Sequence, residues 1–118
     1  MLARLSFLPA GDMLHLSVIT HAEIHYGIGR IPPGRRRRSL ERAYALLLPH
    51  FGQLLDVTVV IAEGYAGIKA GLERRGIVLP ENDLWIAATA IEGGQALVTD
   101  DSHFAAVPGL TTENWLRP

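Results

Sequence analysis

Short apolar runs alternate with segments of helical periodicity along this chain, and that alternation restricts the possible folds more than any other feature of the sequence. Residues 14–19 and 96–99 are mostly apolar and contain β-branched side chains, as is typical of strands. Apolar residues between these two runs recur at helical spacing. Strands that alternate with helices indicate an α/β fold with a parallel sheet.

Capping residues and glycines mark the expected helix boundaries. Thr20 can cap a first helix at 21–28, and Glu23 stands three residues later, which is the capping-box spacing. Gly93 and Gly94 fit the end of a later helix, because glycine readily adopts the conformation that terminates helices. The further helices are expected at 39–51, 60–76 and 80–93, with short strands at 54–57 and 110–112.

The start of the chain does not fit a complete unit of such a fold. Residues 2–8 look like the tail of a helix, and residues 9–12, Pro-Ala-Gly-Asp, form a turn cluster. A parallel sheet needs several adjacent strands, whereas only three or four short ones are predicted. We therefore expect the chain to begin in the middle of a βαβ unit.

Composition narrows the class of protein. A chain of 118 residues that is 48% hydrophobic predicts one ordered domain over residues 1–118. The chain has no cysteine, which excludes disulfides and thiolate metal sites. No apolar run reaches the ~18 residues of a membrane span, and the first residues are too short and interrupted for a secretory signal. We expect a cytoplasmic protein that does not bind membranes.

One basic segment contrasts with the net charge of −1. Arg35, Arg36, Arg37 and Arg38 are consecutive, and further arginines stand at 30 and 42. Such a cluster can hold a nucleic-acid phosphate backbone. The simpler interpretation is the solvated start of a helix, and the sequence leaves both open.

Three segments are expected to bring carboxylates to one edge of the sheet. Glu23 follows the first strand by one helical turn, and Asp83 lies in the opening turn of a helix, where the dipole favours an anion. Asp100 and Asp101 directly follow the strand at 96–99. In open parallel sheets, ligands bind beyond the carboxyl ends of the strands, so these acids are candidates for one site.

Carboxylates without thiolates favour hard cations such as Mg²⁺ or Mn²⁺, and a carboxylate-bound metal suits phosphodiester hydrolysis. Each acid also has a structural interpretation. Glu23 fits a capping box, Asp83 a favourable helix start, and Asp100 with Asp101 a polar turn. Their joint placement favours a metal site, whereas spacing alone leaves the reaction open.

Three motifs resemble the PIN-domain family, in particular its VapC-type toxins. Residues 17–27, SVITHAEIHYG, resemble the family segment with a strand, a catalytic Glu and a following Gly. Residues 80–90, PENDLWIAATA, resemble the helix that presents the third acid. Residues 97–104, LVTDDSHF, with VPGL at 107–110 and ENW at 113–115, resemble the C-terminal strand, fourth acid and closing segment.

The resemblance implies a PIN-like three-layer fold with a central parallel sheet flanked by helices. It implies a Mg²⁺- or Mn²⁺-dependent endoribonuclease that is the toxin of a type II toxin–antitoxin system. Glu23 then matches the second acid, Asp83 the third and Asp101 the fourth, with Asp100 as the adjacent alternative. The implied partners are RNA, an antitoxin and a second copy of the chain, and the arginine cluster becomes a candidate contact for the RNA backbone.

The sequence departs from this family at its start. VapC-type proteins begin with a strand that ends in Leu-Asp-Thr-Asn or a similar stretch, and no such stretch precedes Leu14. Asp12 lies in a turn and does not match it. We therefore expect the first strand and its acid to be missing, through a truncated gene, a late start codon or fragmentation. The alternative function is an inactive PIN remnant that only binds antitoxin or itself.

For the polar residues near the acids, the sequence gives weaker indications of a functional role. Thr99 adjoins two of the acids and is expected to support them through hydrogen bonds, as is Ser17 with less reason. His103 can contact an acid or RNA, although a polar turn residue is the simpler interpretation. His21 and His25 have the i, i+4 spacing of a metal pair, but the accompanying residues do not match a zinc site.

Overall fold

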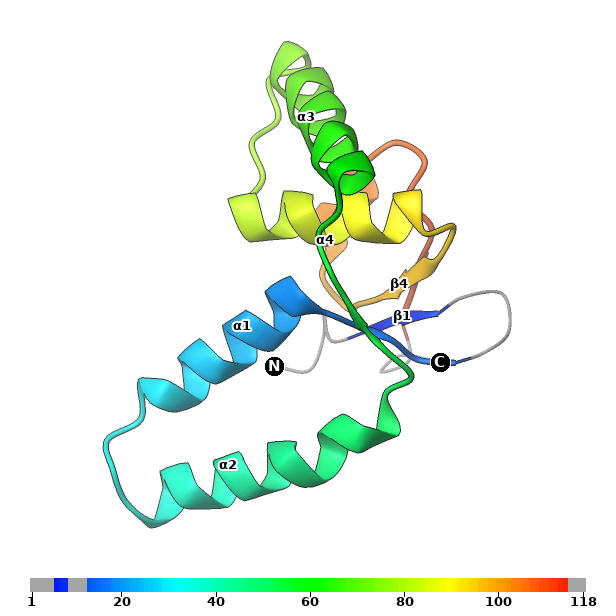
Figure 1. The fold of residues 1–118 in the computed structure, drawn as a ribbon. Helices are drawn as coiled ribbons and strands as arrows, with labels where there is room; N and C mark the ends of the chain where they lie inside the picture. Colours follow the sequence, from blue (N-terminus) through cyan, green and yellow to red (C-terminus); the bar gives the residue numbers. More distant parts are fainter. Residues whose placement is uncertain (1–5, 9–12, 115–118) are drawn as a thin grey trace.

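The computed structural model describes residues 6–8 and 13–114, which form an α/β fold (Figure 1). The described helices are α1 (Val18–Gly29), α2 (Arg35–Leu47), α3 (Val59–Arg74) and α4 (Glu81–Glu92), with the 3-10 helices η1 (Leu48–His50) and η2 (Ser102–Ala106). The described strands are β1 (Ser6–Leu8), β2 (Leu16–Ser17), β3 (Leu54–Leu55), β4 (Ala96–Val98) and β5 (Thr112–Glu113).

The strands form two small sheets in place of the single one expected. Strand β2 pairs with β3, and β4 pairs with β5, and both of these pairs are parallel. Strand β1 pairs antiparallel with β4, with Ser6 opposite Val98. The predicted α/β class and the parallel pairing are thus confirmed, while the edge of β4 that is not paired with β5 is covered by an antiparallel strand.

The structure of residues 6–8 differs from the helix expected there. They form β1, so the helix predicted over 2–8 is wrong at these positions. Backbone groups along β4 need partners, and pairing with them outweighs the weak helical tendency of three residues. Residues 2–5, the turn cluster 9–12 with Asp12, and Trp115 lie outside the described residues.

The first helix begins earlier than expected, because its cap is Ser17. The Ser17 Oγ accepts hydrogen bonds from the backbone N–H groups of Ile19 at 2.9 Å and Thr20 at 3.4 Å. The capping box predicted for Thr20 and Glu23 is therefore wrong, since both residues lie inside α1. Glu23 consequently stands in the second turn of the helix, where its carboxylate does not serve as a cap.

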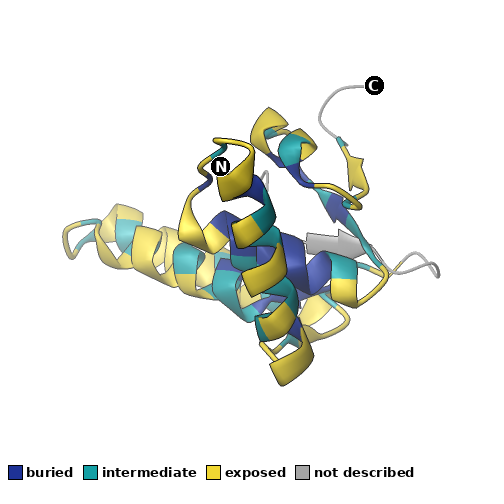
Figure 2. Ribbon diagram, turned by 90° about the horizontal axis from the view of Figure 1, so that it is seen from above, coloured by how far each residue is buried: buried dark blue, intermediate teal, exposed yellow. Residues whose placement is uncertain are grey.

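Helices α1 and α2 form an antiparallel hairpin that projects from the rest of the molecule (Figure 1). Helix α2 begins at Arg35, four residues before the expected start, and none of its residues is buried. Figure 2 shows this exposure along the projecting part of the hairpin. We name the pair of helices with their connection, residues 18–47, the α1–α2 arm.

The core lies around α4, which packs against α3 on one side and β4 on another. Trp85 of α4 stacks on Tyr65 of α3, with ring centroids 3.8 Å apart. The helical apolar spacing predicted for 80–93 is confirmed by the buried residues of α4, and Phe104 of η2 joins the same core. The buried residues of this core cluster are Leu72, Leu79, Leu84, Ile86, Ala87, Ala90, Leu97, Phe104 and Val107. No described helix is long and apolar enough to cross a membrane.

Candidate active site

A hydrogen bond between side chains joins two of the acidic motifs. The Asn82 Nδ2 donates to the Glu23 Oε2 at 3.3 Å, although the two residues are 59 positions apart. Glu23 comes from α1, and Asn82 lies in the first turn of α4, directly before Asp83. The structure therefore brings the start of α4 to the side of α1 that presents Glu23.

Asp83 is buried in the first turn of α4, with 1% of its surface exposed. Burial of a carboxylate is unfavourable unless nearby groups stabilise the charge. The third position of a helix provides such stabilisation through free backbone N–H groups and the positive end of the helix dipole. A buried acid at this position is a candidate for a functional role, and that role stays a prediction.

Asp101 is oriented by three local contacts. Its Oδ1 accepts from the backbone N–H of His103 at 2.9 Å and lies 2.9 Å from the His103 Nδ1, with which it forms an ion pair when the imidazole is protonated. Its own backbone N–H donates to the Thr99 Oγ1 at 3.0 Å. Thr99 is buried and thus supports Asp101, as the sequence predicted, while Asp100 is exposed. These contacts favour Asp101 over Asp100 as the fixed acid at the end of β4.

The elements that carry the acids meet at α4, because α1 and β4 both contact this helix (Figure 1). Among residues 6–8 and 13–114, however, no three histidine, aspartate or glutamate side chains form a group that could hold a metal ion. The bond between Glu23 and Asn82 brings two motifs together, and the approach of Asp101 to them stays a prediction.

Strand β5 on one side of β4 contains Glu113, whereas strand β1 on its other side supplies no further acid. Its residues are Ser6, Phe7 and Leu8. Because β1 is antiparallel to β4, the amino end of β1 lies next to the carboxyl end of β4. The carboxyl end of β1, where a parallel strand would present a ligand, consequently points away from Asp100 and Asp101.

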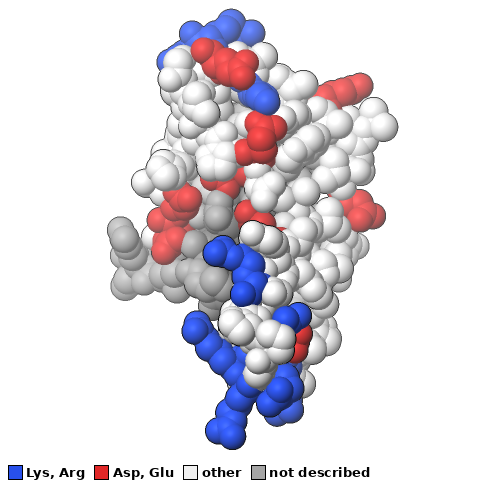
Figure 3. All heavy atoms as spheres, turned by 90° about the vertical axis from the view of Figure 1, so that its left-hand side faces the viewer, with Lys and Arg blue, Asp and Glu red and all other residues white. Residues whose placement is uncertain are grey.

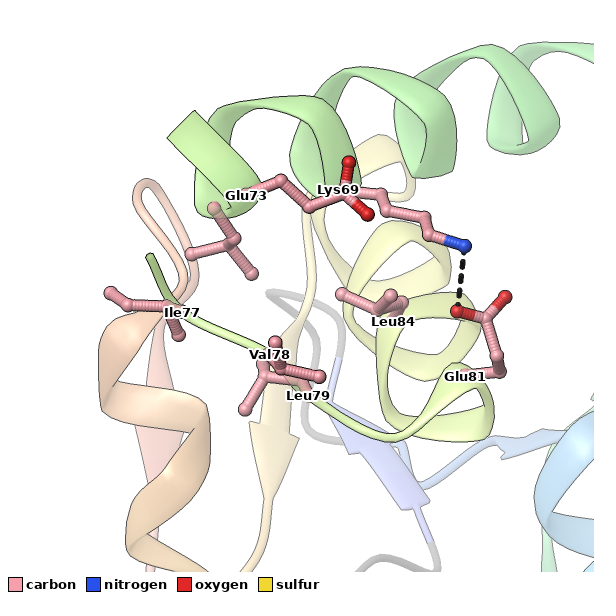
Figure 4. A pocket seen from close by; sticks show the side chains of 8 residues that line it. Lys69, Glu73, Ile77, Val78, Leu79, Glu81 and Leu84 are labelled. Atoms are coloured by element: carbon pink, nitrogen blue, oxygen red, sulfur yellow. Dashed lines mark ion pairs between the residues drawn. The ribbon is translucent and has the colours of Figure 1, made fainter. Parts of the chain in front are cut away.

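Glu81, the acid nearest to Asp83 in sequence, belongs to a different contact. It accepts a hydrogen bond from the Tyr65 hydroxyl and forms an ion pair with the Lys69 Nζ at 2.9 Å (Figure 4). The hydrogen bond from Tyr65, and then that from Lys69, lower the pKa of Glu81. The start of α4 therefore has two faces, with Glu81 bound to α3 and Asn82 bound to α1. Sequence reasoning missed Asn82, whose only signal was its place next to Asp83.

His21 and His25 join α1 to α2. The His21 Nδ1 and the Tyr44 hydroxyl are hydrogen-bonded at 2.6 Å, and the two histidine rings meet edge to face at 4.5 Å. Burial, and then the charge of His25, lower the pKa of His21. The pair is thus engaged in packing the α1–α2 arm.

The lowered pKa of His21 predicts a pH-dependent stability. The folded pKa lies below the ordinary value of 6.5, so the unfolded chain binds more protons, and stability is lost as pH falls below about 6.5. His21→Gln should therefore lose less thermal stability than the wild type between about pH 7.5 and pH 5.5. Melting curves test this, with His50→Gln as the control at an exposed histidine. A loss equal to that of the wild type would contradict the assignment.

Comparisons with known proteins give matches over most of the chain. The PIN domain family matches residues 2–110. The VapC ribonuclease Y4jK of Sinorhizobium fredii is 32% identical over 109 residues, which cover 91% of this chain and 78% of that protein.

Solved structures share the fold. VapBC2 from Rickettsia felis, bound to a DNA fragment from its promoter, superposes with a TM-score of 0.79 at 27% identity, over 87% of this chain and 75% of that chain. VapBC-5 from Mycobacterium tuberculosis, a member of the VapBC family of toxin–antitoxin systems, gives a TM-score of 0.72 at 28% identity, over 85% and 79% of the two chains.

Proposed function

Because this chain belongs to the PIN-domain family, we propose that it is a metal-dependent endoribonuclease and the toxin of a type II toxin–antitoxin pair. The observation that carries the proposal is the hydrogen bond between Glu23 and Asn82, which joins the second acidic motif to the third. The catalytic unit is one domain over residues 1–118, and the catalytic acids are Glu23, Asp83 and Asp101.

The donor chemistry of the site fits a hard divalent cation. The candidate ligands are carboxylate oxygens, with the Asn82 amide nearby, and the chain has no cysteine. Oxygen ligands are those that Mg²⁺ and Mn²⁺ prefer. PIN-domain nucleases generally depend on a divalent metal, and we assign Mg²⁺ or Mn²⁺ here. Such an ion, when bound, neutralises charge on the phosphate and makes an attacking water more acidic.

The protein side chains then have separate tasks. Asp83 is held in a fixed place by its buried helix turn and would supply carboxylate oxygens toward the ion. Glu23 is oriented by Asn82, so its carboxylate is directed to the same helix start. Asp101 contributes the third carboxylate from the turn after β4, where Thr99 and His103 fix its position.

The partners follow from the same family membership. We propose that a cognate antitoxin neutralises the protein, because a solved structure with this fold belongs to the VapBC toxin–antitoxin family. Self-association into a dimer and a cytoplasmic location complete the proposal. The natural RNA is defined only by class, as single-stranded RNA with a phosphodiester bond exposed to the acids.

Incubation of the purified chain with a labelled single-stranded RNA pool tests the proposed activity. Cleavage is expected with Mn²⁺ or Mg²⁺ and not with EDTA, because the carboxylates need the ion to act on the phosphate. Calorimetry with Mn²⁺ alone measures binding independently of cleavage. Absence of both cleavage and Mn²⁺ binding would reject the enzyme and favour the inactive binding module.

A further inference from the structure

An exposed stripe on α1 leads away from the candidate active site. Glu23, Tyr26 and Arg30 are spaced i, i+3 and i+7, which places them on one face of the helix. Two turns separate Glu23 from Arg30, or about 10 Å along the axis. The Tyr26 side chain is 68% exposed, and the Arg30 guanidinium lies 5.5 Å from its ring centroid.

The stripe ends beside the basic start of α2. Arg35, Arg36 and Arg38 are exposed in the first turn of this helix. Arg37 differs, because it donates to the carbonyl of Ile31 at 3.4 Å and pairs with Glu41 at 3.5 Å. Figure 3 shows a large group of cationic side chains at the lower end of this face, a smaller cationic group at its upper end, and acidic side chains between them.

The position of these arginines is unfavourable for the helix itself. The first turn of α2 contains no acid, and the capping residue Gly34 provides no side-chain hydrogen bond. Cations at the amino end of a helix oppose its dipole, and neighbouring like charges repel one another. A local conflict of this kind is expected where function, and not stability, selects the residues.

We propose that the α1–α2 arm binds single-stranded RNA outside the catalytic acids and directs the strand toward Glu23. A base stacks on Tyr26, and phosphates lie on Arg30, Arg35, Arg36 and Arg38, while Arg37 maintains the helix start. An exposed aromatic ring among guanidinium groups fits bases and phosphates together, which an acidic protein segment does not require. The inference rests on the proposed RNA substrate and adds where that RNA is held.

Fluorescence anisotropy with the labelled RNA pool, in EDTA and over a range of salt concentrations, tests the arm without cleavage. The triple variant Arg35→Gln/Arg36→Gln/Arg38→Gln should lower the slope of log affinity against log salt by about 2, since each phosphate contact on a single strand contributes about 0.7. Tyr26→Ala should weaken binding about tenfold and leave the slope unchanged, because stacking does not release counterions.

A control that removes two arginine charges is available at the end of α3. Arg74→Gln/Arg75→Gln removes exposed cations away from the arm and should leave the affinity for RNA nearly unchanged. Melting curves verify that each variant is folded, and the triple variant should melt no lower than the wild type because like charges are removed.

The possible outcomes separate this inference from the proposed nuclease activity. Arm-dependent binding without metal-dependent cleavage would support the RNA arm and reject the enzyme. Cleavage together with an unchanged affinity and salt slope in the triple variant would overturn the arm. If the triple variant lost binding to an acidic peptide while its RNA affinity stayed unchanged, the RNA arm would also be overturned, and the surface would be assigned to a protein partner.

Discussion

Asp83→Asn is expected to lower metal-dependent RNA cleavage by at least about 100-fold, the upper end of the effect seen when groups around a metal are altered. The carboxylate is buried in the opening turn of α4, next to the Asn82 that binds Glu23. Asparagine keeps the size and shape of the side chain but removes the charge that a divalent ion needs. The variant should therefore lose cleavage activity and keep its fold.

Two measurements separate a catalytic role of Asp83 from a structural one. Mn²⁺ affinity, measured by calorimetry, should fall together with cleavage, whereas the melting temperature should change little. Asp56→Asn is the same change at an exposed aspartate after β3, and it should leave RNA cleavage and Mn²⁺ affinity as in the wild type. Cleavage and Mn²⁺ affinity at wild-type levels in Asp83→Asn would remove this residue from the site.

Phe104→Ala is expected to have the largest effect on stability, about 3–5 kcal/mol. The ring is 1% exposed and packs in the core that contains Leu84, Ile86 and Leu97. Its removal loses apolar burial and leaves a cavity that a well-packed core does not refill. Small domains are stable by about 5–15 kcal/mol, so the variant should be close to unfolding at elevated temperature.

Urea denaturation measures this loss as a shift of the midpoint at constant slope. Leu46→Ala provides the control, because this side chain is 69% exposed on α2 and its truncation should change stability by less than about 0.5 kcal/mol. Cleavage should also fall in Phe104→Ala, since η2 carries both the ring and the backbone that orients Asp101. A loss below about 1 kcal/mol would show that η2 is not part of the cooperative core.

Much of the central and C-terminal fold could be predicted from the sequence. The apolar face of α4 and the strand at 96–98 followed their local patterns, and the glycine that ends α4 adopted the expected positive φ, 64° at Gly94. Asp83 lies in the opening turn of a predicted helix and Asp101 follows a predicted strand, whereas Glu23 stands in the second turn of α1, and the role of these acids in one site stays a prediction. Periodicity and turn chemistry are local properties, and for this reason a single sequence reveals them.

The sequence by itself determined the α/β class, the acidic motifs and the basic cluster, because residue type and spacing carry that information. Only the tertiary structure decided that Ser17 caps α1, that Asn82 holds Glu23 and that residues 6–8 cover β4 as an antiparallel strand. In each case, hydrogen-bond donors and acceptors from different segments compete for the same partner. The result depends on which groups are neighbours in space, and spacing along the chain does not specify that.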